Sequence, residues 1–311
     1  MDVNAIVLEA PKKLAMKPLG LKSVGEDEVV VDIAWSGVST GTERLLWSGE
    51  MPPFPGMGYP LVPGYESVGE VVDAGPLAKQ RIGQTVFIPG SNGFIGAKGL
   101  FGGAASTLVT GGDRVVEIDA GLKERGVLIA LAATARRALA LAETPPEVIV
   151  GHGVLGRLMA RIAIAEGKPA PTVWEINADR HSGAQGYSVV HPDEDHRKDY
   201  ASMIDASGGA DILDFMIARL ARGGEIVLAG FYDRVSFAFP PAFMREARIK
   251  VAAEWTPADL EATTALIQSG ALSLDGLITH TRAPADADAA YRTAFNDARC
   301  LKMILDWRGQ A

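Results

Sequence analysis

The stretch EVIVGHGVLGRLMA, Glu147 to Ala160, decides how the middle of this chain folds. A short apolar run leads into three glycines spaced G-x-G-x-x-G and then into an amphipathic segment, which predicts a strand, a tight turn and a helix. Gly151 permits the turn, Gly153 lets the backbone approach a pyrophosphate, and Gly156 lets the helix pack closely on the strand. The stretch therefore predicts a dinucleotide site whose phosphates face the first free amides of the helix.

An acidic residue supports this interpretation. Residues 172–176 are typical of a second strand, and Glu175 comes 19 residues after Gly156. A carboxylate at about this distance accepts hydrogen bonds from the adenosine ribose and repels a 2′-phosphate, which favours NAD over NADP. The alternative is a surface acid at a strand end. Arg180 leaves a further possibility open, in which its side chain lies against the adenine or neutralises a phosphate.

The candidate cofactor residues share a place in the turn or at the end of an expected strand. Ser207 is expected to contact a cofactor ribose, and the backbone near Gly230 the nicotinamide, although such residues also simply make turns. The full candidate set is Gly151, His152, Gly153, Val154, Leu155, Gly156, Glu175, Arg180, Ser207 and Gly230.

Composition limits the class of protein. A chain of 311 residues is long enough for two domains with a substantial core. A net charge of −8 without a basic block argues against nucleic acid as a partner. Cys300 is the only cysteine, which excludes an internal disulfide and fits a reducing cytoplasm. No apolar run is long enough to predict a membrane span.

The predicted secondary-structure pattern changes twice along the chain. Residues 1–121 contain short strand-like runs separated by glycine and proline, which predicts a compact, partly open barrel. Residues 122–254 alternate between strand and helix patterns, which predicts a parallel sheet wrapped by helices. Residues 255–311 contain two helical patterns and are expected to return to the first domain. The connection around His181, His191 and His196, with its acids up to Asp195, is expected to be a solvated loop and not a metal cluster.

Several motifs, in this order, resemble those of the medium-chain dehydrogenase/reductase superfamily: GVSTGTE (37–43), PGYE (63–66), the glycine turn, IDASG (204–208) and GGEIVLAG (223–230). The resemblance implies an α/β protein with a GroES-like, partly open β-barrel catalytic domain and a Rossmann-type doubly wound parallel sheet. Three stretches resemble a branch of this superfamily whose members act in bacteriochlorophyll biosynthesis. They are residues 36–66, 99–106 and 131–139. That likeness implies oxidation of the 3-(1-hydroxyethyl) group of a bacteriochlorophyllide to acetyl, with NAD as the hydride acceptor.

The sequence departs from the zinc-dependent members of the superfamily. Where they carry a cysteine and a histidine as zinc ligands, this chain has Thr40 and Tyr65, neither of which suits zinc. No metal is therefore expected. The resemblance places Thr42 where a hydroxyl touches the substrate oxygen, so Thr42, Thr40, Tyr65 and Glu66 are the candidate catalytic residues. Their alternatives are turn-capping threonines, a packing tyrosine and a structural carboxylate.

Aromatic residues surround these positions in the sequence and are candidates for the wall of a flat, apolar cleft that stacks a tetrapyrrole, with ordinary core packing as the alternative. They are Trp35, Trp47, Phe54, Tyr59, Phe94 and Phe101. Two other functions stay open: a zinc-free NADPH-dependent quinone or enone reductase, and a non-catalytic protein that binds nucleotide and pigment. A homodimer is also an open possibility.

Overall fold

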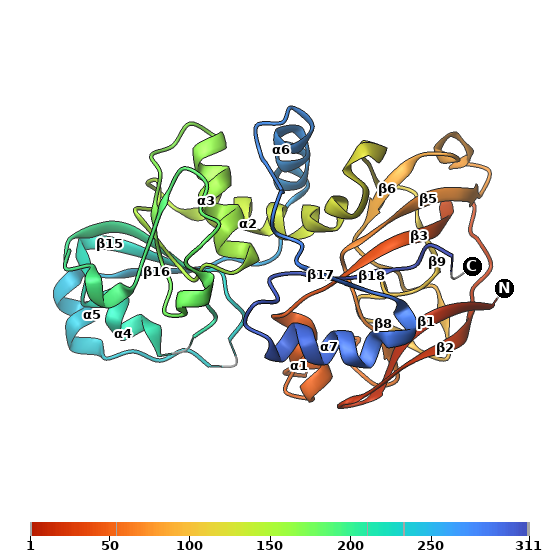
Figure 1. Cartoon of the computed structure of the whole chain (residues 1–311), viewed down its shortest axis with the longest axis horizontal. Helices are drawn as coiled ribbons and strands as arrows, with labels where there is room; N and C mark the ends of the chain where they lie inside the picture. Colours follow the sequence, from red (N-terminus) through yellow and green to blue (C-terminus); the bar gives the residue numbers. More distant parts are fainter. Residues whose placement is uncertain (1, 54, 210, 233, 310–311) are drawn as a thin grey trace. The chain divides into compact units, whose positions relative to one another are not determined.

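The computed structural model describes residues 2–53, 55–209, 211–232 and 234–309. The chain divides into two compact units (Figure 1): unit 1, Met1–Ala130 with Leu277–Ala311, and unit 2, Leu131–Gly276. These boundaries differ from the predicted ones after residues 121 and 254. Helix α6 (Pro257–Gln268) belongs to unit 2 and not to the returning segment, because Asp259 at its first turn is ion-paired at 2.8 Å with Arg136 of α2 (Ile129–Leu141).

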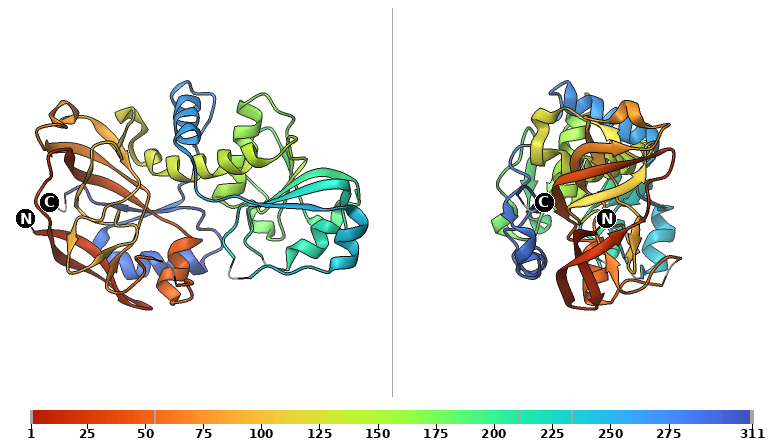
Figure 2. Two further views of the ribbon diagram at one scale, coloured as in Figure 1. Left: turned by 180° about the vertical axis from the view of Figure 1, so that it is seen from behind. Right: turned by 90° about the vertical axis from the view of Figure 1, so that its right-hand side faces the viewer.

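Unit 1 is built around the long strand β3 (Glu28–Val38), which pairs antiparallel with three other strands. One of them, β18 (Met303–Asp306), comes from the far end of the sequence, and Met303 pairs with Val38. Figure 2 shows this returning segment in blue beside β3 in red. The C-terminal residues are therefore part of the same sheet that carries residues 36–38.

The described strands of unit 1 form two sheets, with side chains of both sheets in one hydrophobic core. The first sheet has the order β7 (Phe94–Ile95), β2 (Lys13–Leu21), β1 (Asp2–Ala10), β4 (Leu61–Val62) and β8 (Lys98–Gly99). The second has the order β10 (Val116–Glu117), β6 (Thr85–Ile88), β5 (Ser67–Ala74), β3, β18 and β17 (His280–Arg282), and β9 (Thr107–Gly111) also pairs with β3. The helices are α1 (Thr42–Ser48), α7 (Ala287–Asn296) and the 3-10 turns at Lys79–Arg81, Ala120–Leu128 and Pro284–Asp286.

Unit 2 contains a parallel sheet whose described strands have the order β13 (Ser188–Val190), β12 (Thr172–Trp174), β11 (Val148–Val150), β14 (Tyr200–Asp205), β15 (Leu220–Leu228) and β16 (Arg248–Val251). The order reverses between β11 and β14, which is the place where doubly wound sheets bind ligands. All three residues of β11 are buried, as a central strand covered on both faces requires. The predicted fold class is confirmed.

Helices cover both faces of this sheet. Figure 1 shows α3 (Val154–Ala165) on one side, and α4 (Ile212–Ile217) and α5 (Phe239–Arg245) on the other. Short 3-10 turns lie at Ala178–Arg180 and Pro192–Glu194. No helix in the described part of the chain is long and apolar enough to cross a membrane.

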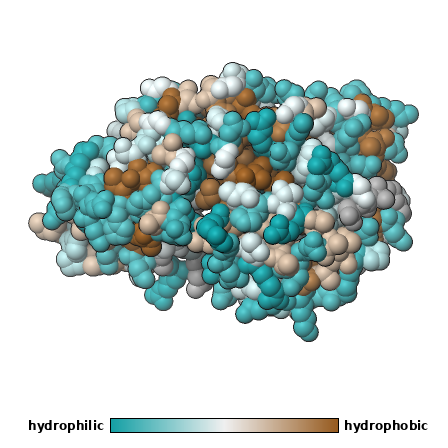
Figure 3. Space-filling view, viewed as in Figure 1, coloured by the Kyte–Doolittle hydropathy of each residue, from teal (hydrophilic) through white to brown (hydrophobic). Residues whose placement is uncertain are grey.

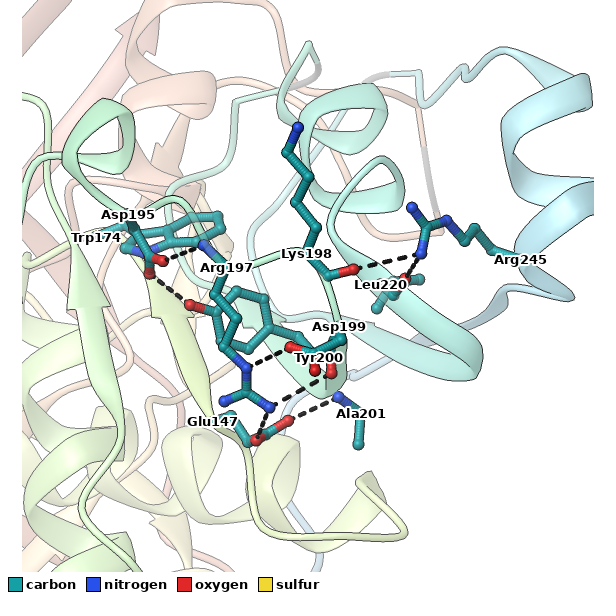
Figure 4. Close-up of polar contacts among 10 residues, drawn as sticks. All are labelled: Glu147, Trp174, Asp195, Arg197, Lys198, Asp199, Tyr200, Ala201, Leu220 and Arg245. Carbon is teal, nitrogen blue, oxygen red and sulfur yellow. Dashed lines mark hydrogen bonds and ion pairs between the residues drawn. The ribbon is translucent and has the colours of Figure 1, made fainter.

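The connection between β13 and β14 is better anchored than the sequence predicted (Figure 4). Asp195 accepts hydrogen bonds from the indole of Trp174 at 2.8 Å and from the hydroxyl of Tyr200 at 2.5 Å. Arg197 pairs with Glu147 at 2.7 Å and stacks over Tyr200. Most residues from Asp193 to Asp199 are exposed, as a solvated loop requires, whereas Asp195 is half-buried because two aromatic donors bind its carboxylate. Among the described residues no cluster of histidines, cysteines and acids can hold a metal.

Candidate active site

The glycine turn of unit 2 has the geometry that the sequence predicted. It connects β11 directly to α3, and Val154 and Leu155 supply helix amides that have no partner within the helix. A Cβ atom on Gly156 would clash with the carbonyl oxygen of Gly151, so the helix packs on the turn only because residue 156 is glycine. A Cβ atom on Gly153 would meet nothing within 4 Å, which leaves room for a pyrophosphate at this point.

Glu175 lies directly after β12 and is 7% exposed, so it is not a surface acid. Its Oε2 accepts the amide hydrogen of His152 at 2.9 Å, and its Oε1 accepts that of Asn177 at 2.8 Å. Each carboxylate oxygen can accept a second hydrogen bond. Glu175 therefore holds the turn and retains capacity for a ribose hydroxyl.

His152 is fully buried, and its ring ties the turn to the next loop. Its Nδ1 lies 2.5 Å from the carbonyl oxygen of Arg180, which can only accept, so Nδ1 carries the proton. Its Nε2 therefore accepts from the hydroxyl of Tyr187 at 2.8 Å. Burial lowers the pKa of His152 to about 4, so the ring is neutral near pH 7. Arg157, also buried, donates to the carbonyl oxygens of His152 and Ser182 and holds the same loop.

The ends of β14 and β15 are joined by one buried acid. Asp205 accepts the amide and hydroxyl hydrogens of Ser207 at 2.9 and 2.6 Å, and it also accepts the hydroxyl of Tyr232. A Cβ atom on Gly230 would lie 2.7 Å from Cα of Gly208, so the two strand ends touch. Ser207 is exposed at this edge, as a residue that contacts a ligand must be. Asp205 thus fixes the two loops that carry the predicted residues 207 and 230.

Unit 1 contains a buried acid that the sequence analysis did not assign. Glu43, in the first turn of α1, is 1% exposed. Its Oε2 accepts the hydroxyl of Tyr291 of α7 at 2.6 Å, and its Oε1 accepts the amide hydrogen of Ser39 at 3.1 Å. Burial raises the pKa of Glu43 to about 7, although both hydrogen bonds oppose the shift.

Glu66, a candidate catalytic residue in the sequence analysis, forms a fully buried ion pair with Lys302. Burial raises the pKa of Glu66, and the ammonium group of Lys302 opposes this. A Cβ atom on Gly37 would clash with the Glu66 carboxylate, so the pair depends on glycine in β3. The geometry favours the structural alternative for Glu66, and a catalytic role stays a prediction.

Tyr65, Thr42 and Ser39 come together beside these acids. The hydroxyl oxygen of Tyr65 lies 2.7 Å from Oγ of Ser39, and the nearby side chain of Thr42 acts to lower the pKa of the phenol. Burial raises the pKa of Tyr65 well above its usual range, so the phenol keeps its proton and acts through hydrogen bonds. Thr42 is half-buried at the start of α1, while Thr40 is exposed to solvent.

The predicted aromatic residues do not share one environment. Phe101 lies edge-on against Tyr65, with ring centroids 5.4 Å apart. Phe94 is a core residue, 4% exposed, which does not fit a cleft wall. Trp47 packs on Phe295 and Tyr59 bonds to the carbonyl oxygen of Leu46, so both hold α1. Trp35 lies under the guanidinium of Arg308, and Phe54 lies outside the described residues.

Sequence reasoning missed Ser39, Glu43, Tyr291 and Lys302 as members of the unit 1 site. An acid in the short helix after GVSTGT was the one available signal, because Glu43 follows Thr42 directly. Tyr291 and Lys302 gave none. They reach the site through α7 and the segment before β18, and only the pairing of β18 with β3 brings them there.

Comparison with known proteins agrees with this architecture. Residues 25–120 match the alcohol dehydrogenase GroES-like domain. The chain is 57% identical to the 2-desacetyl-2-hydroxyethyl bacteriochlorophyllide A dehydrogenase of Rhodobacter capsulatus, covering 99% of both chains. It is 55% identical to the protein of the same name from Cereibacter sphaeroides, covering 100% of both.

Solved structures share the fold. A putative zinc-binding dehydrogenase from Sinorhizobium meliloti 1021, bound to NADP, superposes with a TM-score of 0.83 at 20% identity and covers 98% of this chain and 99% of its own. At that identity the likeness concerns the fold alone. The two full-length relatives at 55–57% identity show more: the chain belongs to the medium-chain dehydrogenase/reductase superfamily and, within it, to the family of the bacteriochlorophyllide dehydrogenases.

Proposed function

We propose that this protein oxidises the 3-(1-hydroxyethyl) group of a bacteriochlorophyllide to acetyl in bacteriochlorophyll biosynthesis, with hydride transfer to NAD. The observation that carries the proposal is the identity of 57% and 55% to two dehydrogenases of this name over the whole of both chains. The matched length spans both units.

The residues of unit 1 suit an alcohol. The nicotinamide, when bound, accepts the hydride from the carbinol carbon. The hydroxyl proton must then leave, and hydrogen bonds must hold the oxygen in place. Thr42 and Tyr65 are both half-buried, and the raised pKa of Tyr65 keeps its phenol protonated. We assign Thr42 and Tyr65 the orientation of the substrate oxygen, with water at the exposed side, where Thr40 lies, receiving the proton.

We infer that the reaction proceeds without zinc. Threonine and tyrosine hydroxyls stand at positions 40 and 65, and zinc binds cysteine sulfur, histidine nitrogen or carboxylate oxygen. The two nearby carboxylates are otherwise engaged, Glu66 with Lys302 and Glu43 with Tyr291. Turnover that persists in a strong chelator would support this inference.

NAD preference rests on Glu175. A 2′-phosphate next to this carboxylate would suffer like-charge repulsion, so NADP should bind about tenfold more weakly or worse. Arg180→Ala tests the opposite possibility. If Arg180 neutralises a phosphate, the variant loses affinity for NADP more than for NAD. If Arg180→Ala loses affinity for NAD and NADP equally, or loses none, the preference for NAD is attributed to Glu175.

The decisive assay follows the pigment's long-wavelength band and NADH absorbance together, with purified protein, NAD, 3-(1-hydroxyethyl)bacteriochlorophyllide a and a chelator. A coupled band shift with stoichiometric NADH is the expected result. Consumption of NADPH with quinones, and no pigment oxidation, would point to the reductase alternative. Binding of NADH and pigment without turnover would point to a non-catalytic role.

We also propose a homodimer, supported by apolar side chains on unit 2. Most of the face in Figure 3 is hydrophilic. Phe239, Phe243 and Met244 of α5 and Val251 of β16 are nevertheless 63–71% exposed, and β16 is an edge strand. Exposed apolar clusters beside an open strand edge favour self-association. Phe243→Glu should reduce the mass seen in sedimentation to that of one chain, whereas Ile95→Glu on exposed β7 should not.

A further inference from the structure

Glu43 is a buried acid whose two hydrogen-bond donors carry no charge. They are the hydroxyl of Tyr291 at 2.6 Å and the amide of Ser39 at 3.1 Å. In the described part of the chain no cation forms a salt bridge with Glu43, and the buried ammonium group of Lys302 is paired with Glu66 instead. Burying a carboxylate without a cation is costly. The Glu43 carboxylate is nevertheless kept beside the hydroxyls of Ser39, Thr42 and Tyr65, which suggests that it has a function there.

One residue connects Glu43 to the hydroxyl cluster. Ser39 donates its amide hydrogen to Glu43, while its hydroxyl oxygen lies 2.7 Å from that of Tyr65. Thr42, whose side chain lies near Tyr65 and acts to lower its pKa, directly precedes Glu43 at the start of α1. The position of the Glu43 carboxylate therefore bears on Ser39, the hydrogen-bond partner of Tyr65, and on the neighbouring residue Thr42.

We propose that Glu43, held by Tyr291, is a positioning residue whose ionised form keeps the Ser39, Thr42 and Tyr65 hydroxyls oriented for the substrate alcohol. The proposal rests on the function proposed above. An ionised carboxylate accepts both donors. A protonated one carries a hydrogen of its own, which competes with the Ser39 amide or the Tyr291 hydroxyl. Protonation thus loosens the residue that orients Tyr65.

The surroundings place this change of charge near neutral pH. Burial raises the pKa of Glu43 to about 7, with some repulsion from Glu66, while the bonds from Tyr291 and Ser39 and the charge of Lys302 lower it. The groups that face Glu43 are Tyr291 of α7, the Ser39 amide after β3, Tyr65 and Glu66 between β4 and β5, and Lys302 before β18. We therefore expect oxidation to slow as pH falls through about 7.

The test is the pH profile of kcat for pigment oxidation by the full chain. Wild type should lose activity below an inflection near pH 7. Glu43→Gln should remove the inflection and lower kcat about ten- to a hundredfold at pH 8, with KM for the pigment within about twofold. Tyr291→Phe should move the inflection to higher pH, because it removes a bond that lowers the pKa of Glu43.

Tyr200→Phe is the matched control, since it removes a tyrosine–carboxylate bond in unit 2 (Figure 4) and should leave the inflection in place. The proposal is overturned if Glu43→Gln keeps the wild-type inflection, or if Tyr291→Phe does not move it. A loss of stability with an unchanged profile would show a structural role only.

A second measurement separates this proposal from the proposed function. Infrared spectra of the full chain should show a carboxyl band that titrates near pH 7 and is absent in Glu43→Gln. In Tyr291→Phe, a ring mode assigned to Tyr65 should still shift when the carboxyl band titrates. That shift should be absent in the double variant Tyr291→Phe/Tyr65→Phe. If wild type binds but does not oxidise pigment, the proposed function fails. The coupling of Glu43 to Tyr65 then stands or falls on these spectra.

Discussion

The glycine turn of unit 2 and the acid cluster of unit 1 are both buried polar arrangements, but they are assembled over different sequence distances. The turn, its helix and Glu175 lie within 151–175. The hydrogen bond from the backbone amide of His152 to the Glu175 carboxylate spans 23 residues. Glu43 and Tyr291 are 248 residues apart. The turn works mainly through backbone groups, whereas the cluster works through side-chain pairs. Substitutions in the turn should therefore act on dinucleotide binding and on local helix packing, and those in the cluster on folding and on the orientation of its hydroxyls.

The largest effect is expected where the cluster loses its cation. Lys302→Met leaves the Glu66 carboxylate buried and unpaired, which should lower the free energy of unfolding by about 3–5 kcal/mol in urea titrations. Lys302→Met/Glu66→Gln should recover part of this loss. Arg222→Met, which breaks an exposed pair with Glu246, should cause no measurable change. Equal losses in the single and double variants would contradict the role of the pair.

The turn offers a matched pair of glycine variants. Gly156→Ala forces a methyl group against the Gly151 carbonyl and should lower the free energy of unfolding by about 1–3 kcal/mol. Gly153→Ala enters open space and should change it by less than about 0.5 kcal/mol. It should still weaken dinucleotide binding about tenfold, measured by fluorescence titration, because the methyl group occupies the phosphate position. Unchanged affinity in Gly153→Ala would place the phosphates elsewhere.

Buried titratable groups should give the two units opposite responses to pH. The pKa of His152 falls from 6.5 to about 4 on folding, so the unfolded chain binds more protons in that window and stability declines as pH drops from 6.5 to 4. The pKa of Glu43 rises from 4.5 to about 7, so stability declines as pH rises from 4.5 to 7.

Urea unfolding of His152→Gln and Glu43→Gln at several pH values tests these signs. Each substitution should flatten its own part of the stability profile, since glutamine does not titrate. If both variants changed the profile in the same direction, the assignment of the two groups would be wrong.

A modest loss of stability is expected at a helix cap in unit 2. Thr256 and Asp259 form a reciprocal capping box at the start of α6. Thr256→Ala should lower the free energy of unfolding by about 1 kcal/mol, and Thr256→Ser should retain most of it. A loss comparable to that in Lys302→Met would show that this local element is coupled to the rest of the unit.

The sequence predicted the parts that follow local rules. The turn at 151–156 and the buried Glu175 lie where glycine spacing and strand pattern place them. The aromatic set fared less well, because composition does not distinguish a core residue such as Phe94 from a half-buried one such as Phe101, which packs against Tyr65. The second unit extends to Gly276, beyond the predicted boundary at 254, and the pairing of Asp259 with Arg136 leaves no mark in sequence.

By itself the sequence determined the dinucleotide turn, the strand and helix alternation of unit 2 and the likeness to a dehydrogenase family, since these depend on residue types at fixed short spacings. Only the tertiary structure decided that Glu43 meets Tyr291 and that Glu66 meets Lys302. The physical reason is that the charge of a buried acid is set by the donors and cations around it. Here those groups arrive from the far end of the chain, through the pairing of β18 with β3.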